Sequence, residues 1–133
     1  MMRTTVIIEK DENGFSAFTK NLRTVLHGSG KSVKEAKEEL MACYEDIKDS
    51  YTNEGKAIPK ELQNLTFDYR YDISALFDDF RFLNISQFAR EIGINTSLMH
   101  HYKKGDTYIS ASQAKKIETG LHQIGRRFLT ISL

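Results

Sequence analysis

Residues 85–104 read ISQFAREIGINTSLMHHYKK, a pattern typical of two short helices joined by a tight turn. Ala89 is small where the two helices would cross, and Gly93 allows the positive φ that such a turn needs. Ile94 follows the glycine and is placed to anchor the turn in the core. The stretch therefore predicts a helix-turn-helix. The other apolar residues expected in its small core are Phe88, Ile92, Leu98, Met99 and Tyr102.

Helical patterns continue on both sides of this motif. Apolar residues three and four apart over 73–80 predict one helix before it. Within the motif, Ser86 is the expected N-cap of the first helix, and Asn95 or Thr96 is the expected N-cap of the second. Gly105 is expected to end that second helix.

The end of the chain predicts a further helix and then a strand. Ser110 opens a capping box with Gln113, and apolar residues follow it in helical register. Residues 127–133 alternate in polarity, which fits either a short strand or the tail of the helix, and of the two we expect the strand. Residues 73–133 are therefore expected to form an all-α helix-turn-helix domain with a C-terminal strand. The apolar residues of its last helix are Ala114, Ile117, Leu121, Ile124 and Phe128.

The first 72 residues predict a different kind of structure. The β-branched stretch Thr4–Glu9, the alternating stretch Phe15–Lys20 and the stretch Thr24–His27 predict three short strands. The dipeptide Asn13-Gly14 favours a hairpin between the first two strands.

A helix and a fourth strand follow. Ser32 and Glu35 form a capping box, and the helix is expected to run to about Asn53. The alternating stretch Thr66–Asp72 predicts the fourth strand. The order β-β-β-α-β predicts a two-layer α+β domain over residues 1–72. The apolar stripe of its helix is Val33, Ala36, Leu40, Cys43, Tyr44, Ile47 and Tyr51.

Composition is that of a globular protein. Of the 133 residues, 40% are hydrophobic and 28% are charged, which excludes a wholly disordered chain. No apolar run approaches the ~18–20 residues of a membrane span, and the N-terminus does not resemble a secretory signal. The single cysteine, Cys43, cannot form an internal disulfide. We therefore expect a cytoplasmic protein.

The two ends of the chain differ in charge. Residues 1–79 hold 11 Lys and Arg against 15 Asp and Glu, a net charge of −4. Residues 80–133 hold 8 against 3, a net charge of +5. This asymmetry favours a nucleic-acid contact in the C-terminal part.

The stretch 85–104 resembles the helix-turn-helix of the Cro and lambda-repressor-like family. The resemblance implies that the second helix of the motif enters the major groove, with its N-terminal residues against base edges. Hydroxyl and imidazole groups would contact bases, and amide or lysine side chains would contact phosphates. The residues expected at the DNA are Gln87, Thr96, Ser97, His100, His101, Lys103 and Lys104.

The N-terminal part resembles another family. Residues 6–17 (VIIEKDENGFSA), 28–36 (GSGKSVKEA) and 55–59 (GKAIP) together look like the HicB antitoxin family. One departure is the segment 20–23, KNLR, where members often carry a Pro-Asp-Leu-Pro-like sequence. The resemblance implies a degenerate ribonuclease-H-like fold without catalysis. It also implies that this part covers HicA, a small RNA-cleaving toxin, and that members with a DNA-binding domain dimerise and repress their own operon.

An enzyme is not expected. Asp11 and Glu12 fall in a turn, and Asp68 and Asp72 fall on the polar face of a strand, so these carboxylates are expected to face water. Cys43 belongs to an apolar helix stripe, which indicates a core residue rather than a nucleophile.

No metal or cofactor is expected either. His100 and His101 are adjacent, so on a helix they point about 100° apart and do not converge on a metal. The stretch GSGKS at 28–32 lacks the spacing of a phosphate-binding loop.

The function expected from these patterns is that of an antitoxin and autorepressor of HicB type. It would neutralise a HicA-like toxin by direct binding and repress its own operon as a homodimer or larger homo-oligomer. The alternative is a helix-turn-helix transcription regulator whose N-terminal domain senses a small ligand. No toxin-contact residue can be assigned from the sequence.

Overall fold

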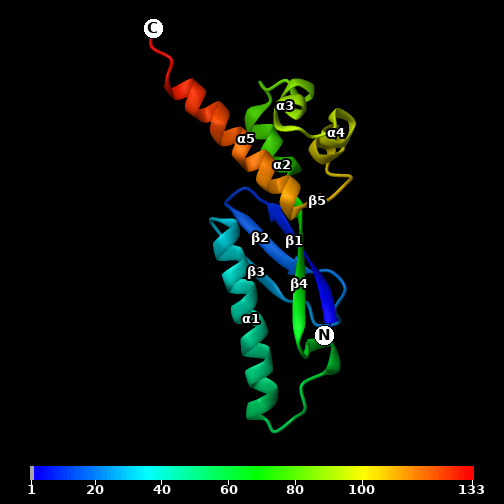
Figure 1. Cartoon of the computed structure of the whole chain (residues 1–133). Coiled ribbons are helices and arrows are strands. Elements are labelled where there is room, and N and C mark those ends of the chain that lie inside the picture. Colours follow the sequence, from blue (N-terminus) through cyan, green and yellow to red (C-terminus); the bar gives the residue numbers. More distant parts are fainter. Residues whose placement is uncertain (1) are drawn as a thin grey trace. The chain divides into compact units, whose positions relative to one another are not determined.

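In the computed structural model, which describes residues 2–133, the chain has the mixed α+β class that its sequence predicts. It divides into two compact units, unit 1 up to Arg70 and unit 2 over Tyr71–Leu133 (Figure 1). The predicted domain boundary lay between residues 72 and 73. The division therefore falls two residues earlier in the chain, inside the fourth strand.

The strands form a five-stranded sheet in the order β3-β2-β1-β4-β5. The first three are antiparallel neighbours, with Ile8 opposite Ala17 and Ala17 opposite Gly28. The short β5 is next to β4 in the sheet. The last two residues of β4 belong to unit 2, as β5 does. The strands are β1 (Met2–Lys10), β2 (Phe15–Thr19), β3 (His27–Gly30), β4 (Leu65–Asp72) and β5 (Ile109–Ser110).

The third strand lies later in the chain than predicted. It covers His27–Gly30 rather than Thr24–His27, although β-propensity favours the earlier stretch. The reason is the helix α1 (Val33–Asn53), which lies directly on this strand. A Cβ on Gly28 would lie 2.3 Å from the backbone nitrogen of Leu40. Glycine is needed because another backbone approaches the strand closely.

Helix α1 begins where the capping box predicts. The Oγ of Ser32 accepts a hydrogen bond from the Glu35 amide at 3.1 Å, while the Glu35 carboxylate accepts one from the Lys31 amide at 2.8 Å. Three turns of α1 bury Ala36, Leu40 and Tyr44 against the sheet. Helix α1 therefore packs on the strands β2 and β3 of unit 1.

Tyr44 also joins α1 to the segment that leads into β4. Its hydroxyl donates to the carbonyl of Leu62, at the end of the 3-10 helix η1 (Lys60–Leu62), at 2.5 Å. Its ring meets Phe67 edge to face, with centroids 5.9 Å apart. Phe67 and Tyr69 of β4 therefore lie on the α1 side of the sheet, since the Lys37 ammonium lies 4.1 Å from the Tyr69 ring centroid.

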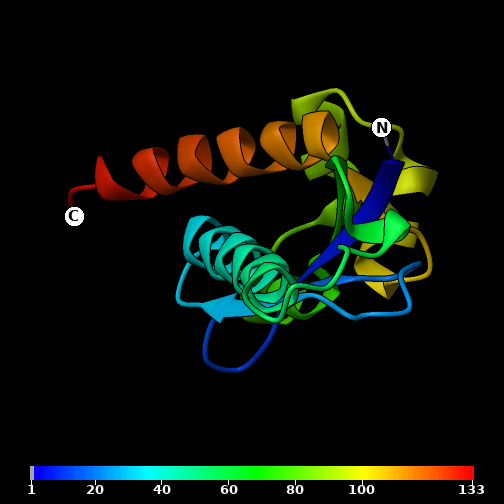
Figure 2. The same cartoon turned by 90° about the horizontal axis from the view of Figure 1, so that it is seen from below.

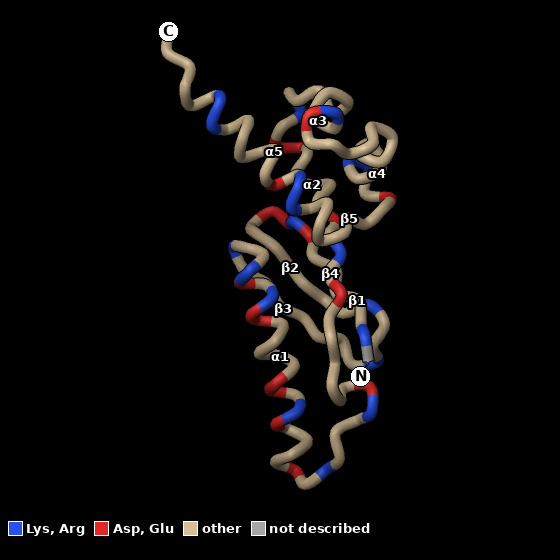
Figure 3. Tube along the Cα trace, viewed as in Figure 1, with Lys and Arg blue, Asp and Glu red and all other residues tan. Residues whose placement is uncertain are grey.

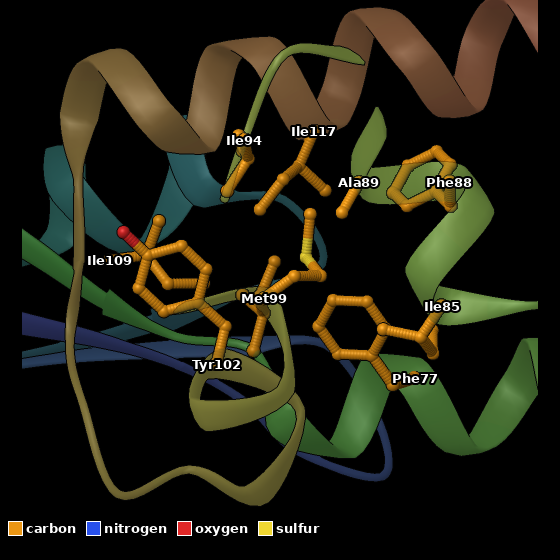
Figure 4. Close-up of a cluster of buried hydrophobic side chains, with 10 residues drawn as sticks. Phe77, Ile85, Phe88, Ala89, Ile94, Met99, Tyr102, Ile109 and Ile117 are labelled. Atoms are coloured by element: carbon orange, nitrogen blue, oxygen red, sulfur yellow. The ribbon is translucent and has the colours of Figure 1, made fainter. Parts of the chain in front are cut away.

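Unit 2 is built around one apolar cluster, with Met99 in its middle (Figure 4). Its helical elements are α2 (Ser74–Phe77), the 3-10 helix η2 (Asp78–Phe80), α3 (Ile85–Ile92), α4 (Thr96–Lys104) and α5 (Ala111–Leu129). The fully buried cluster is Ile73, Phe77, Ile85, Phe88, Ala89, Ile94, Met99, Tyr102, Ile109 and Ile117. Every core residue predicted for the helix-turn-helix belongs to this cluster or packs against it.

The predicted N-cap of α3 is wrong. The cap is Asn84, whose Oδ1 accepts from the Gln87 amide at 3.0 Å, and Ser86 lies inside the first turn. Ile85 is buried as the first helical residue, so the cap is Asn84, two positions earlier than the predicted Ser86. For α4 the cap is Asn95, one of the two predicted residues.

The predicted C-terminal strand is also wrong. Helix α5 continues to Leu129, and residues 130–133 adopt neither helix nor strand. The alternation over 127–133 indicated two faces, but neither face is buried, because Phe128, Leu129 and Ile131 are all exposed. A strand without a partner strand is not stable, whereas the helix only has to add one more turn.

Candidate nucleic-acid interface

Both helices of the helix-turn-helix end in the same way. Gly93 and Gly105 have φ of 78° and 79°, in the left-handed region that glycine adopts readily. After Gly93, the Ile94 amide donates to the Ala89 carbonyl at 2.9 Å. This is the bond of a Schellman motif, and it fixes the turn and places the Ile94 side chain in the core.

Helix α4 has a buried face and a polar face. Met99 and Tyr102 are buried on one side. The exposed residues of the opposite side are spaced i, i+3, i+4 and i+7, so they form one stripe along the helix. They are Ser97, His100, His101 and Lys104. The structure thus places four of the seven predicted DNA-contact residues on one solvent-facing surface.

The other three predicted residues lie around this stripe. Thr96 is the first residue of α4 and is half-buried, and Lys103 is exposed beside the stripe. Gln87 is exposed on the first turn of α3. The His100 Nε2 lies 3.1 Å from the Oγ of Ser86, the neighbour of Gln87. The beginning of α3 is therefore beside the middle of α4.

His101 has a partner that the sequence reading missed. Its Nδ1 lies 3.0 Å from the Oδ1 of Asp106. The pairing follows from the end of α4, where the Asp106 amide donates to the His101 carbonyl at 3.3 Å. In a Schellman motif, the residue after the terminal glycine donates its amide to a carbonyl at the start of the last helical turn, so the two residues lie close together. The spacing of His101, Gly105 and Asp106 is the signal that would have revealed the contact.

The difference in net charge between the two units is smaller than that between residues 1–79 and 80–133. Unit 1 holds 11 Lys and Arg against 12 Asp and Glu, a net charge of −1, and unit 2 holds 8 against 6, a net charge of +2. The earlier values depended on a division after residue 79, inside η2. That division assigned Asp72, Asp78 and Asp79 to the wrong unit. Figure 3 shows acidic and basic residues on both units. The geometry of α3 and α4, rather than net charge, therefore favours a nucleic-acid contact.

Unit 1 has one strongly acidic surface region. A hollow of about 1100 Å³ lies at the β1–β2 turn and the start of α1. Most of its charged lining is acidic, with Lys31 as the single basic residue. We call this region the acidic hollow. Its carboxylates come from Asp11, Glu12, Glu35, Glu38 and Glu39.

Among residues 2–133, no three His, Cys, Asp or Glu side chains gather closely enough to hold a metal ion. Cys43 is half-buried on α1. Each helix in the described part of the chain lacks the length or the hydrophobicity that crossing a membrane requires.

No family model matches this chain, and no curated protein or solved structure matches it either.

Proposed function

We propose that this chain is a helix-turn-helix DNA-binding repressor and an antitoxin of HicB type, acting in the cytoplasm. The observation that supports DNA binding best is the division of α4 into a buried face and a polar face. Met99 and Tyr102 hold the helix in the core, and Ser97, His100 and Lys104 are left for a ligand. This is the arrangement of a recognition helix, whose outer residues contact base edges in the major groove.

Each exposed side chain has a role in this proposal. Ser97 lies near the N-terminus of α4, and its hydroxyl can donate to a base or accept from one. His100 has its Nε2 beside Ser86, so its Nδ1 is the ring atom that faces a base. Lys104, at the end of the helix, and Gln87, on the first turn of α3, contact phosphates. As a dimer, the protein would contact two half-sites about one helical turn apart.

The antitoxin part of the proposal rests on the HicB resemblance of unit 1. The observed element order β1-β2-β3-α1-β4 is the order that the resemblance implies. Two of the three matching stretches, at the hairpin turn and at the start of α1, contribute to the acidic hollow. Its carboxylates favour association with a basic partner such as an RNA-cleaving toxin, because opposite fields steer encounter.

The test of the antitoxin proposal is growth arrest and co-purification. The small open reading frame next to this gene is induced alone and then together with this chain. The expected result is arrest that this chain relieves, and a stable complex on a size-exclusion column. Absence of both arrest and complex would contradict the antitoxin role and would favour the ligand-sensing regulator.

The test of DNA binding is independent of the toxin. The purified chain is titrated against labelled DNA from upstream of its own gene, with unrelated DNA of equal length as the control. The expected result is tighter binding to the upstream DNA, by at least about a thousandfold at physiological salt. A triple variant, Ser97→Ala with His100→Ala and Lys104→Ala, leaves the buried face of α4 intact and is expected to lose this preference.

A further inference from the structure

Exposed apolar side chains gather at the end of α5. Ile117, in the middle of the helix, is 1% exposed, whereas Phe128 and Leu129 are 53% and 86% exposed. The ring of Phe82, itself exposed, meets the Phe128 ring with centroids 6.4 Å apart. Figures 1 and 2 both show the red end of α5 extending beyond α2, α3 and α4. An apolar patch of this kind marks an interaction surface.

A glycine lies in the middle of this exposed part of the helix. Gly125 sits between Leu121 and Leu129, and a hollow of about 610 Å³ opens over it. A Cβ added to Gly125 would meet nothing within 4 Å, whereas one on Gly120 would lie 2.4 Å from a methyl group of Ile92. Gly120 is therefore explained by packing inside unit 2. Gly125 is not, although glycine in a helix is about 1 kcal/mol less favourable than alanine.

The sequence around Gly125 is complementary to itself in an antiparallel pair of helices. With Gly125 opposite Gly125, Leu121, which is half-buried against the core of its own unit, lies level with Leu129 of the other copy, and His122 lies level with Phe128. These residues are spaced by three and four from the glycine, so they share its face of α5. An isologous interface of this kind repeats each contact across a two-fold axis.

The cations nearest this face lie at its rim or are paired within the chain. Arg126 is about 100° around the helix from Gly125, which places it at the rim. The Arg127 guanidinium is held by the Glu91 carboxylate of α3, at 2.9 Å. The centre of the face thus carries no Lys, Arg, Asp or Glu, and a small residue at its midpoint allows two backbones to approach closely.

We infer that two copies of this chain associate through an antiparallel crossing of their α5 helices at Gly125. The inference names the interface of the homodimer in the proposed function. The structure assigns this face to a second copy because of the self-complementary register and the glycine that no contact within the chain explains.

The first test is sedimentation equilibrium of the full chain over a series of protein concentrations, without DNA. The wild type is expected to dimerise. Leu129→Asp and Gly125→Gln are each expected to raise the dimer dissociation constant by at least about tenfold, since one buries a charge and the other fills the crossing point. Neither change is expected to lower the melting temperature of the monomer, because both side chains meet solvent there. Val25→Asp, at an exposed apolar residue of unit 1, is the matched control.

The second test locates the two-fold axis. Gly125→Cys and Thr119→Cys are made in a Cys43→Ala background and oxidised. Gly125→Cys is expected to give a disulfide-linked dimer, because position 125 faces its own copy. Position 119 is six residues away, so it lies about 18 Å from its copy in an antiparallel pair and should not crosslink. The two positions share one helix, which makes them a matched pair.

A monomeric wild type, or a dimer that Leu129→Asp and Gly125→Gln leave unchanged, would overturn the inference. A dimer through another surface that still binds its upstream DNA would overturn the inference and leave the proposed function standing. A dimer through α5 that binds neither DNA nor toxin would leave the inference standing and overturn the proposed function.

Discussion

The Nε2 atom of His100 lies 3.1 Å from the Oγ of Ser86, so an exposed side chain of α4 is held by the first turn of α3. The contact orients the imidazole before any ligand arrives. A side chain that is already oriented loses less conformational freedom on binding. In the proposed function, this contact prepares His100 to distinguish bases.

Replacing His100 is expected to change base preference. The variant His100→Ala should bind its best site more weakly, by about 1–3 kcal/mol, and should accept other bases at one position of each half-site. Competition titrations with single-base variants of the site measure this. Equal weakening on every sequence would show that His100 contacts phosphate instead.

Replacing Lys104 is expected to act on all sequences alike. Lys104→Ala removes a cation near the end of α4 and should weaken specific and nonspecific binding together. The slope of log K against log salt should become less steep by about 1. Lys60→Ala, in η1 of unit 1, serves as the control, and its salt slope should equal that of the wild type.

Removing the carboxylate of Asp106 is expected to strengthen DNA binding. Asp106 lies 3.0 Å from His101 on the proposed DNA surface, where a negative charge repels phosphate. Asp106→Asn should tighten binding by up to about fivefold at low salt, with the gain shrinking as salt rises. Asp79→Asn, in η2, is the charge-matched control. A loss of affinity in Asp106→Asn would mean that the contact positions His101 productively.

The turn of the helix-turn-helix is expected to tolerate few residues. Gly93 has φ of 78° with open space around it, so Gly93→Ala meets backbone strain but no clash. The free energy of unfolding should fall by about 1–2 kcal/mol, and less in Gly93→Asn, because asparagine tolerates the left-handed region. Thermal or urea unfolding of both variants checks this. Equal losses of stability in the two variants would show that the left-handed φ at position 93 is not the cause.

The contact of α1 with β3 is expected to be intolerant of any side chain. Gly28→Ala would put a Cβ 2.3 Å from the Leu40 backbone nitrogen. The helix must move or unit 1 must lose its packing, a loss of about 1–3 kcal/mol or more. Ser29→Ala, at the exposed neighbouring position, should change stability little. Urea titrations of the two variants compare them directly.

Local signals made much of this fold predictable. Capping boxes located the starts of α1 and α5, and Gly93 located the turn between α3 and α4. These signals work because a cap or a left-handed glycine acts within one turn of chain. The predicted core residues of the helix-turn-helix followed from spacing, since they all lie between Phe88 and Tyr102.

The failures all involve contacts that lie outside the local pattern. Residues 24–27 have strand propensity, but the approach of α1 decided that Gly28 is in the strand instead. Asn84 displaced Ser86 as the cap because Ile85 is needed in the core. The expected C-terminal strand does not form because no other strand in the described part of the chain pairs with it. For the candidate site, the outer residues of α4 were predictable from periodicity, whereas Asp106 was reached only through the geometry of the turn at Gly105.

The strand order has a consequence for the time course of folding. β4 takes its place beside β1, although the whole of β2, β3 and α1 lies between them in the chain. The sheet of unit 1 is therefore incomplete until Arg70 has left the ribosome. The contacts between α3 and α4, in contrast, join residues that are close together in the chain and can form early. A nascent chain is expected to hold a hairpin and α1 with an open sheet edge for several seconds at ordinary elongation rates. In that interval, the edge strand awaiting β4 is the part of the protein most open to wrong pairing.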